Sequence, residues 1–182
     1  MIIDDFFEYP DAIREVLLHQ DMLNHTAEDN ITYPGIVALP SSIKEELISN
    51  LNYLFRNRIT GSKCFARYSF EEMSPPNWAH SDFNIAQFVA LIYMNPQPHS
   101  GDGTHLVRHK SGFDYHPDTD ERKDILLSES NDRSKWDITF TCPAVYNRAF
   151  IVNAYLLHAA AMKYGTSKAN SRLVLTCFFD LD

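Results

Sequence analysis

From residue 63 onward the sequence is a series of short apolar runs separated by Gly, Pro, Asn and Asp. Runs of this length, rich in β-branched and aromatic residues, are typical of strands and too short for most helices. Many short strands after a helical start favour a mainly β domain: a sandwich, a barrel or a jelly roll. The expected strands are Lys63–Ser69, Ala86–Met94, Thr104–His109, Trp136–Cys142, Ala149–Val152, Leu156–Ala160 and Arg172–Phe179.

The part of the chain before residue 63 has helical spacing instead. One helix is predicted over Asp11–Gln20, with Pro10 as a suitable starting residue. A second is predicted after Ser42, because Ser42-x-x-Glu45 matches a capping box and apolar residues follow at helical spacing. The stretch 33–40 between them is predicted to be a loop with an edge strand.

The length of 182 residues suits one domain, with helical support over 1–62 and a β core over 63–182. The segment 111–135 interrupts that core, since it is crowded with charge and has only a small apolar patch. We expect an insertion with one short helix that covers the substrate side of a site as a lid. A solvated loop on the far side is the alternative.

Composition narrows the function classes. The net charge of −8 disfavours nucleic acid and anionic membranes as partners. Three scattered cysteines without a CxxC motif argue against a disulfide scaffold and a zinc ribbon. The acidic N-terminus is no signal peptide, and no apolar run is long enough to span a membrane. We therefore predict a cytoplasmic protein, a monomer or a homodimer.

The tripeptide His-x-Asp occurs at His19, His80 and His116. His19 lies at the end of a predicted helix, where residues two apart point to different faces. His116 lies in the charged insertion. His80 and Asp82 precede the longest apolar strand, and on an extended backbone both side chains point to the same side, so one metal can bind both.

His158 is the candidate third ligand, although an isolated histidine in an apolar run is more often an ordinary core residue. Fourteen residues later, Arg172 opens the last apolar strand. An inward-facing arginine on a strand costs several kcal/mol unless it meets an anion, about as much as other unpaired buried charges. The alternatives are an exposed position at the strand's start, or a pair with Asp180 or Asp182.

Two histidines and one carboxylate on one face make the facial triad of non-haem Fe(II) oxygenases. The order of motifs along the chain resembles the 2-oxoglutarate- and Fe(II)-dependent dioxygenases, most of all their prolyl-4-hydroxylase-like branch and an uncharacterised bacterial group within it. The resemblance covers about two thirds of the chain, from Lys63 to Asp180. It rests on His80-x-Asp82, Phe88–Asn95, Gly101–Thr104, Gly103–His109, Trp136-Asp137, Tyr146–Phe150, His158 and Arg172–Asp180.

The resemblance implies a double-stranded β-helix, the cupin-like jelly roll, whose two sheets enclose the metal. It implies that His80, Asp82 and His158 bind Fe(II) and form the catalytic centre. The co-substrate would be 2-oxoglutarate, with ascorbate as an optional reductant. Family members release succinate and CO2 as they oxidise a substrate C–H bond.

The resemblance also assigns residues to the co-substrate. Arg172 would bind the distal carboxylate of 2-oxoglutarate, with help from Tyr93 and, at a less secure position, Tyr68. The usual Arg-x-Ser pair is absent because Val174 takes the place of the serine, and Thr176 is the possible substitute on the same face. A second departure is Gly101-Asp102-Gly103, which replaces the double glycine usual before the fourth strand.

The leading interpretation is a hydroxylase that acts on a small molecule or a peptide. One alternative is a cupin-like metal isomerase or dioxygenase that does not use 2-oxoglutarate. The other is a jelly-roll binding module without catalysis. Several further residues flank the expected site and are candidates for contact with the substrate, although ordinary surface or strand-pair contacts are the favoured interpretation of each: Arg67, Trp78, Asn84, Arg108 and His109.

Overall fold

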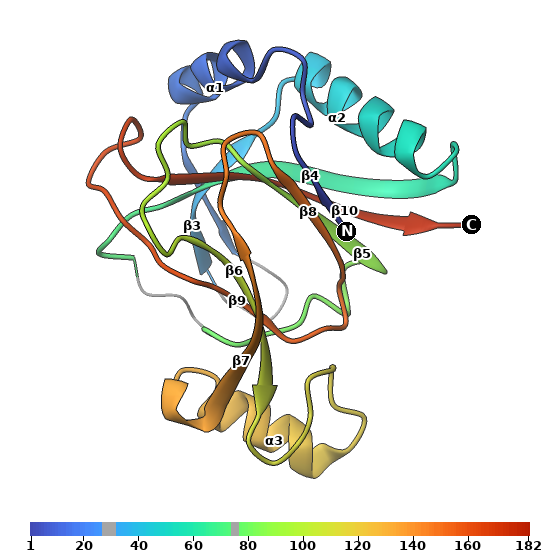
Figure 1. The fold of residues 1–182 in the computed structure, drawn as a ribbon, viewed down its shortest axis with the longest axis vertical. Coiled ribbons are helices and arrows are strands. Elements are labelled where there is room, and N and C mark those ends of the chain that lie inside the picture. The colour runs from blue at the N-terminus through green and yellow to red at the C-terminus, as the bar shows by residue number, and fades with distance from the viewer. Residues whose placement is uncertain (27–31, 74–76) are drawn as a thin grey trace.

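The computed structural model describes residues 1–26, 32–73 and 77–182. Its main element is a seven-stranded sheet in which neighbouring strands are antiparallel (Figure 1). In spatial order the strands are β1 (Ile2–Ile3), β8 (Ala149–Asn153), β5 (Phe88–Tyr93), β10 (Arg172–Leu181), β4 (Ile59–Ser69), β3 (Thr32–Ala38) and β2 (Leu23–Thr26).

A second, three-stranded sheet faces part of the first. Its order is β7 (Trp136–Pro143), β6 (Gly103–His109) and β9 (His158–Ala160). Apolar side chains fill the space between the two sheets, among them Tyr93 and Val174 from the large sheet and Cys142 from the small one. This mainly β, two-sheet architecture confirms the predicted fold class.

Two helices cover the outer face of the large sheet, α1 (Pro10–His19) and α2 (Ser41–Leu54) (Figure 1). Leu17 of α1 and Leu47 of α2 are fully buried in the same apolar cluster as Leu175 of β10. Each such leucine contributes roughly 1.5–3 kcal/mol by leaving water. The N-terminal helices therefore support the sheet on the side opposite the second sheet.

Of the two predicted helix starts, one is correct and one is wrong. Pro10 is the first residue of α1, as predicted. The capping box predicted at Ser42 is wrong, because α2 begins one residue earlier, at Ser41, and no side chain caps it. Pro40 is the N-cap residue, so Ser42 already lies inside the first turn. The stretch predicted to be mostly loop contains the seven-residue strand β3, which pairs with β4.

The insertion between β6 and β7 contains the predicted short helix, α3 (Asp120–Glu129), followed by a 3₁₀ turn at Arg133–Lys135. The Thr119 hydroxyl caps α3 by accepting a hydrogen bond from the Arg122 N–H. Ile125 and Leu126 pack against a third apolar cluster, which includes residues of β6, β7 and β9.

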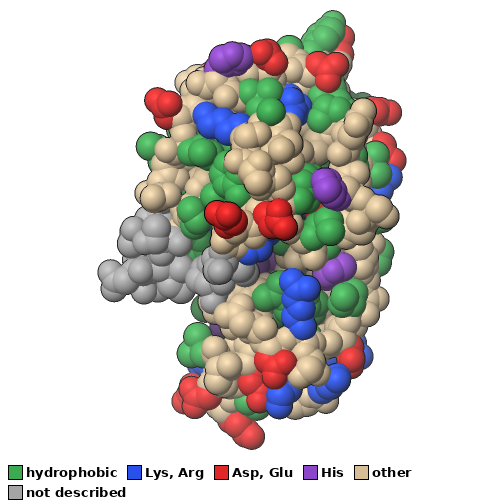
Figure 2. Space-filling view, turned by 90° about the vertical axis from the view of Figure 1, so that its left-hand side faces the viewer, with side chains coloured by type: hydrophobic (Ala, Val, Ile, Leu, Met, Phe, Trp, Pro, Cys, Tyr) green, Lys and Arg blue, Asp and Glu red, His purple; other side chains and the backbone are tan. Residues whose placement is uncertain are grey.

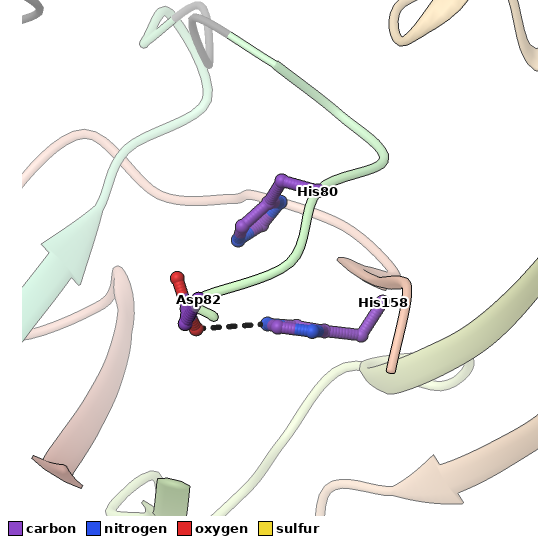
Figure 3. Close-up of side chains that lie close together, drawn as sticks. All are labelled: His80, Asp82 and His158. Carbon is purple, nitrogen blue, oxygen red and sulfur yellow. Dashed lines mark ion pairs between the residues drawn. The ribbon is translucent and has the colours of Figure 1, made fainter. Parts of the chain in front are cut away.

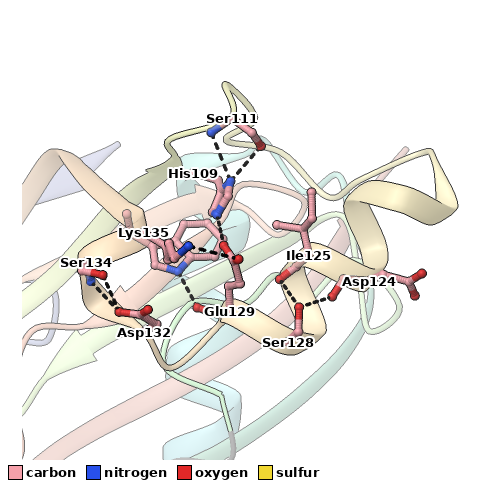
Figure 4. Close-up of polar contacts among 10 residues, drawn as sticks. His109, Ser111, Asp124, Ile125, Ser128, Glu129, Asp132, Ser134 and Lys135 are labelled. Atoms are coloured by element: carbon pink, nitrogen blue, oxygen red, sulfur yellow. Dashed lines mark hydrogen bonds and ion pairs between the residues drawn. The ribbon is translucent and has the colours of Figure 1, made fainter.

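Polar contacts also fix the insertion (Figure 4). The Glu129 carboxylate lies 2.8 Å from His109 Nε2 and 3.3 Å from Lys135 Nζ. The indole N–H of Trp136 donates to the Glu129 carbonyl at 2.9 Å. These contacts hold the last residue of α3, and with it the insertion, against the small sheet.

The surface carries both signs of charge, and Figure 2 shows them spread over one face. No described helix is long and apolar enough to cross a membrane.

Candidate metal centre

The segment that follows β4 brings His80 and Asp82 beside the start of β9. His80 and His158 form an antiparallel bridge, in which each backbone N–H donates to the other's carbonyl at 3.1 and 2.8 Å. The Asp82 N–H donates to the Ala154 carbonyl at 2.8 Å, which extends the contact. These backbone hydrogen bonds hold the segment that carries His80 and Asp82 against the chain around His158.

The three side chains converge (Figure 3). One ligand atom from each of His80, Asp82 and His158 lies within 4.8 Å of the other two, and His158 Nε2 is 3.2 Å from Asp82 Oδ2. Among the described residues, this is the only group of three or more histidine, cysteine or acidic side chains that could hold a metal ion.

The other two His-x-Asp histidines lie elsewhere. His19 is exposed on α1, where its Nδ1 lies 2.9 Å from the Glu15 carbonyl. His116 stacks on Phe83, with ring centroids 3.3 Å apart, and its Nδ1 lies 2.9 Å from the Ser81 hydroxyl. Neither joins a metal-binding group in the described structure.

Both histidines of the triad turn the same nitrogen away from the centre. His80 Nδ1 lies 3.1 Å from the Trp78 carbonyl, and His158 Nδ1 lies 2.9 Å from the Leu156 carbonyl. A carbonyl only accepts hydrogen bonds, so each Nδ1 carries the hydrogen and each Nε2 is the atom for a metal. Each carbonyl belongs to the second residue before its histidine, so local backbone geometry orients both rings.

The protonation of the metal-free triad is uneven. Burial, reinforced by the charge of His158, lowers the pKa of His80 to about 4. Burial also disfavours charge on His158, but the hydrogen bond and the charge of Asp82 outweigh it and raise the pKa of His158. For Asp82, burial favours the neutral acid, yet the hydrogen bond from His158 prevails and lowers the pKa. Below the raised pKa of His158, a metal must therefore displace a proton from that ring.

The donor set fits a first-row divalent metal. Two imidazole nitrogens and one carboxylate oxygen converge from one side, which leaves the opposite side for exogenous ligands. In the metal-free site, the carboxylate pairs with a protonated imidazole. A metal ion would take the place of that proton, and the carboxylate and the imidazole would both remain in the site as its ligands.

Arg172 points inward from β10 and meets a carboxylate of the protein itself. Its Nε donates to Asp102 Oδ1 at 2.8 Å and its Nη2 donates to the Gly103 carbonyl at 3.2 Å. The Asp102 side chain is 1% exposed and that of Arg172 is 8% exposed. The Tyr164 hydroxyl donates to the other Asp102 oxygen at 3.1 Å, so both carboxylate oxygens have partners.

The two acids considered as alternative partners of Arg172 lie at the other end of β10. Asp180 accepts a hydrogen bond from the Gln87 N–H at 2.7 Å, and Asp182 is exposed at the end of the chain. The partner is instead Asp102, from the turn where an acid replaces a glycine.

Tyr93 and Thr176 lie on the inner face of the large sheet with Arg172. The Tyr93 hydroxyl donates to Thr104 Oγ1 at 2.8 Å, and its ring centroid is 5.8 Å from Arg172 Cζ. Burial raises the pKa of Tyr93, so its hydroxyl stays protonated. Thr176 is buried four residues after Arg172, on the same side of the strand.

Tyr68 is not brought to this site. It lies opposite Leu173 on the face of the sheet beneath α1 and α2, where burial raises its pKa to about 12. The inward position belongs to its neighbour Arg67, which lies opposite Val174. Strand alternation explains the difference, since a shift of one residue reverses the face.

Sequence reasoning missed the importance of Asp102 and Arg67. The signal for Asp102 was its place between two glycines, which was interpreted only as an altered turn. Arg67 lies between Ala66 and Tyr68 in an apolar strand, so the argument applied to Arg172 applied to it equally.

The insertion borders the segments that carry the metal ligands. The Ala79 N–H donates to the Ser130 carbonyl at 3.1 Å, next to His80. The Leu157 N–H donates to the Asp114 carbonyl at 2.9 Å, next to His158. Both ends of the insertion thus contact residues adjacent to the candidate ligands.

A scan against protein-family models finds no match, and a search of curated proteins finds none either. Solved structures do match. HygX from Streptomyces hygroscopicus, solved with nickel and 2-oxoglutarate, has a TM-score of 0.60 at 15% identity, over 97% of this chain and 80% of that one. A prolyl hydroxylase from Trichoplax adhaerens, in complex with a hypoxia inducible factor peptide, has 0.57 at 15%, over 98% and 82%.

A Pseudomonas putida prolyl-4-hydroxylase also matches, with a TM-score of 0.52 at 12% identity over 100% of this chain and 92% of that one. The chain therefore has the jelly-roll fold of the prolyl hydroxylases and of 2-oxoglutarate-binding proteins such as HygX. The resemblance predicted from the sequence is confirmed for the fold.

Proposed function

We propose that the protein is an Fe(II)- and 2-oxoglutarate-dependent oxygenase that hydroxylates a small molecule or a peptide, with release of succinate and CO2. The observation that carries the proposal is the convergence of His80, Asp82 and His158, with both Nε2 atoms directed at Asp82 or the space beside it. The matching folds support the same class, because two of them were solved as prolyl hydroxylases and one with 2-oxoglutarate bound.

In this proposal, His80, Asp82 and His158 hold the iron. The bound iron and 2-oxo acid would supply oxygen activation and the oxidation of the substrate. The protein's own part is to fix the two imidazoles through their Nδ1 hydrogen bonds and to keep Asp82 ionised.

The distal end of the 2-oxo acid would lie toward Arg172, Tyr93 and Thr176. Arg172 has used Nε and Nη2 on the protein, so it would act through its remaining amino group and its charge. The insertion, which contacts residues next to His80 and His158, would exclude water as a lid. The three free cysteines fit the cytoplasmic location predicted from the sequence.

A second candidate follows from one specific observation. Because Asp102 already neutralises Arg172, the expected binding group for 2-oxoglutarate is partly occupied by the protein itself. This favours the alternative of a cupin-like metal enzyme, an isomerase or a dioxygenase, that does not use 2-oxoglutarate.

An anaerobic titration separates the two. The purified protein is loaded with Fe(II), and 2-oxoglutarate is added while the visible spectrum is recorded. The proposal predicts a weak charge-transfer band that needs both components and is absent in an Asp82→Ala variant. Iron binding with no band at any 2-oxoglutarate concentration would support the cupin-like alternative. A protein that binds no iron would contradict both.

A further inference from the structure

Two of the three cysteines face each other across the large sheet. Cys64 of β4 and Cys177 of β10 are directly opposite in the antiparallel register, and their Sγ atoms lie 2.6 Å apart. The third cysteine, Cys142, belongs to β7 in the other sheet. The fold thus places two thiols in direct contact, although they are 113 positions apart in the sequence.

The backbone around this pair has the spacing that a disulfide needs. Residues directly opposite in an antiparallel pair have Cα atoms about 4.5–5.5 Å apart, and disulfides span about 4.4–6.8 Å. The pairing of β10 with β4 runs without a bulge from Arg172 to Phe179, so the register is fixed on both sides of Cys177. Both cysteines pack in the apolar cluster beneath α1 and α2, so their side chains share one face of the sheet. An S–S bond between them needs no change of register or of face.

The two thiols differ in exposure. Cys177 is fully buried on a strand that has neighbours on both sides, whereas Cys64 is only partly buried. The pairing of β3 with β4 extends only as far as Phe65, the residue next to Cys64. Cys64 is therefore the thiol of the pair that a small reagent meets first, and Cys177 is in contact with it.

The surroundings also favour the thiolate of Cys64. A hydrogen bond from the Cys177 S–H lowers the pKa of Cys64, and the charge of Lys44 on α2 acts in the same direction, against the effect of burial. The same contact, together with burial, raises the pKa of Cys177. Burial also raises the pKa of Cys142. The thiolate is the nucleophilic form of cysteine, so Cys64 is the most reactive of the three.

We propose that Cys64 and Cys177 form a modification site, at which hydrogen peroxide closes a reversible disulfide that ties β4 to β10. The Cys64 thiolate attacks one peroxide oxygen and the O–O bond breaks, which gives a Cys64 sulfenic acid and a hydroxide ion. The hydroxide takes up the proton that Cys64 gave up and becomes water. The Cys177 sulfur then loses its proton and forms the S–S bond, while the sulfenic hydroxyl leaves with that proton as a second water. Two thiols are oxidised and one peroxide is reduced to two waters.

The bond would form outside the candidate metal centre. Cys177 and its neighbour Thr176 point to opposite faces of β10, and the cysteine face is the one beneath the helices. The inference therefore does not rest on the proposed function. A disulfide of this kind also suits a reducing compartment, where such bonds are transient and respond to oxidation.

The test oxidises the full chain and maps the thiols that are lost. The wild type is reduced, transferred to buffer with a chelator and without reductant, and treated with a small molar excess of hydrogen peroxide. The remaining thiols are alkylated after unfolding, and unreduced peptides are identified by mass spectrometry. We expect the free thiols to fall from three to one, with the Cys64 peptide linked to the Cys177 peptide. Dithiothreitol should restore all three thiols.

Two variants test the order of the steps. Cys64→Ala removes the thiol that reacts first, and Cys142→Ala is the matched control because it removes a buried thiol from the other sheet. Cys64→Ala should slow the loss of thiols by about tenfold or more, since the thiolate fraction changes about tenfold for each unit of pKa. Cys142→Ala should react at the wild-type rate and still form the linkage. Equal rates in the wild type and Cys64→Ala would contradict the proposal.

The stability of the oxidised protein gives a second readout. A bond that closes so long a loop restricts the unfolded chain, so oxidation should raise the urea midpoint by about 1 M, and dithiothreitol should reverse the shift. An oxidised wild type that lacks the Cys64–Cys177 linkage overturns the proposal, whether its thiols stay free, pair with Cys142 or proceed to sulfinic acid. A linkage that leaves the midpoint unchanged overturns it as well. Should a variant fail to fold, the peptide map of the wild type still decides.

Discussion

The metal centre and the Arg172 pair are both buried polar groups on the inner side of the jelly roll, but their charges are arranged differently. At the metal centre, backbone carbonyls hold the outer nitrogens of His80 and His158, and the inner nitrogens remain for a ligand. At Arg172, the Asp102 carboxylate and the Gly103 carbonyl accept from Nε and Nη2, so only one amino group has no hydrogen-bond partner among the described residues. The first arrangement leaves ligand atoms for a cation, whereas the second pairs a buried cation with an acid of the same chain.

The largest expected effect concerns the triad. His158→Ala should weaken Mn(II) or Fe(II) binding by more than about 100-fold, since even loss of an outer partner of a metal ligand costs 10–100-fold. His19→Ala is the matched control, because His19 also belongs to a His-x-Asp tripeptide but lies exposed on α1. Calorimetric titration measures both variants, and equal affinities would show that the triad does not bind the metal.

The next effect separates the two regions by stability. Asp102→Ala leaves Arg172 buried without its partner, which should lower the free energy of unfolding by about 3–5 kcal/mol. The double variant Asp102→Ala, Arg172→Met should recover a large part of that loss. Urea unfolding measures both. A single-variant loss below about 1 kcal/mol, the level of a typical substitution, would show that the pair is not structural.

Metal binding should depend on pH through one group. The raised pKa of His158 means that the site holds a proton below that pKa, so metal affinity falls as the pH falls. His80, with a pKa of about 4, is already neutral above pH 5 and adds nothing there. Between about pH 5 and 6.5 the affinity should therefore rise about tenfold per pH unit. A hundredfold rise per unit would mean that both histidines lose protons.

The smallest effect tests the support that the insertion gives to the metal side. Leu126 packs against the small sheet's apolar cluster, while its neighbour Leu127 is 70% exposed. Leu126→Ala should lower the free energy of unfolding by about 1–2 kcal/mol, less than for a fully buried leucine. Leu127→Ala should change it by less than about 0.5 kcal/mol. Equal urea midpoints would show that α3 is not packed on the sheet.

The sequence predicted the metal side better than the arginine side, for a physical reason. His80 and Asp82 are two residues apart, so strand alternation alone places them together. Asp102 and Arg172 are 70 residues apart, and only the folded sheets bring them into contact. The sequence did not predict that Tyr68 faces away from the site, because the register of the strand decides which side chains point inward. Arg67 and Tyr68 are neighbours, so the sequence offered two candidates for one inward position.

The central claim is that His80, Asp82 and His158 bind one metal ion from a common side. A crystal structure of the protein with Mn(II) and 2-oxoglutarate, with anomalous scattering from the metal, tests it directly. The account predicts one strong anomalous peak, at about 2.0–2.3 Å from Nε2 of both histidines and from an Asp82 oxygen. A peak bound elsewhere, or one that lacks any of these three ligands, would contradict it.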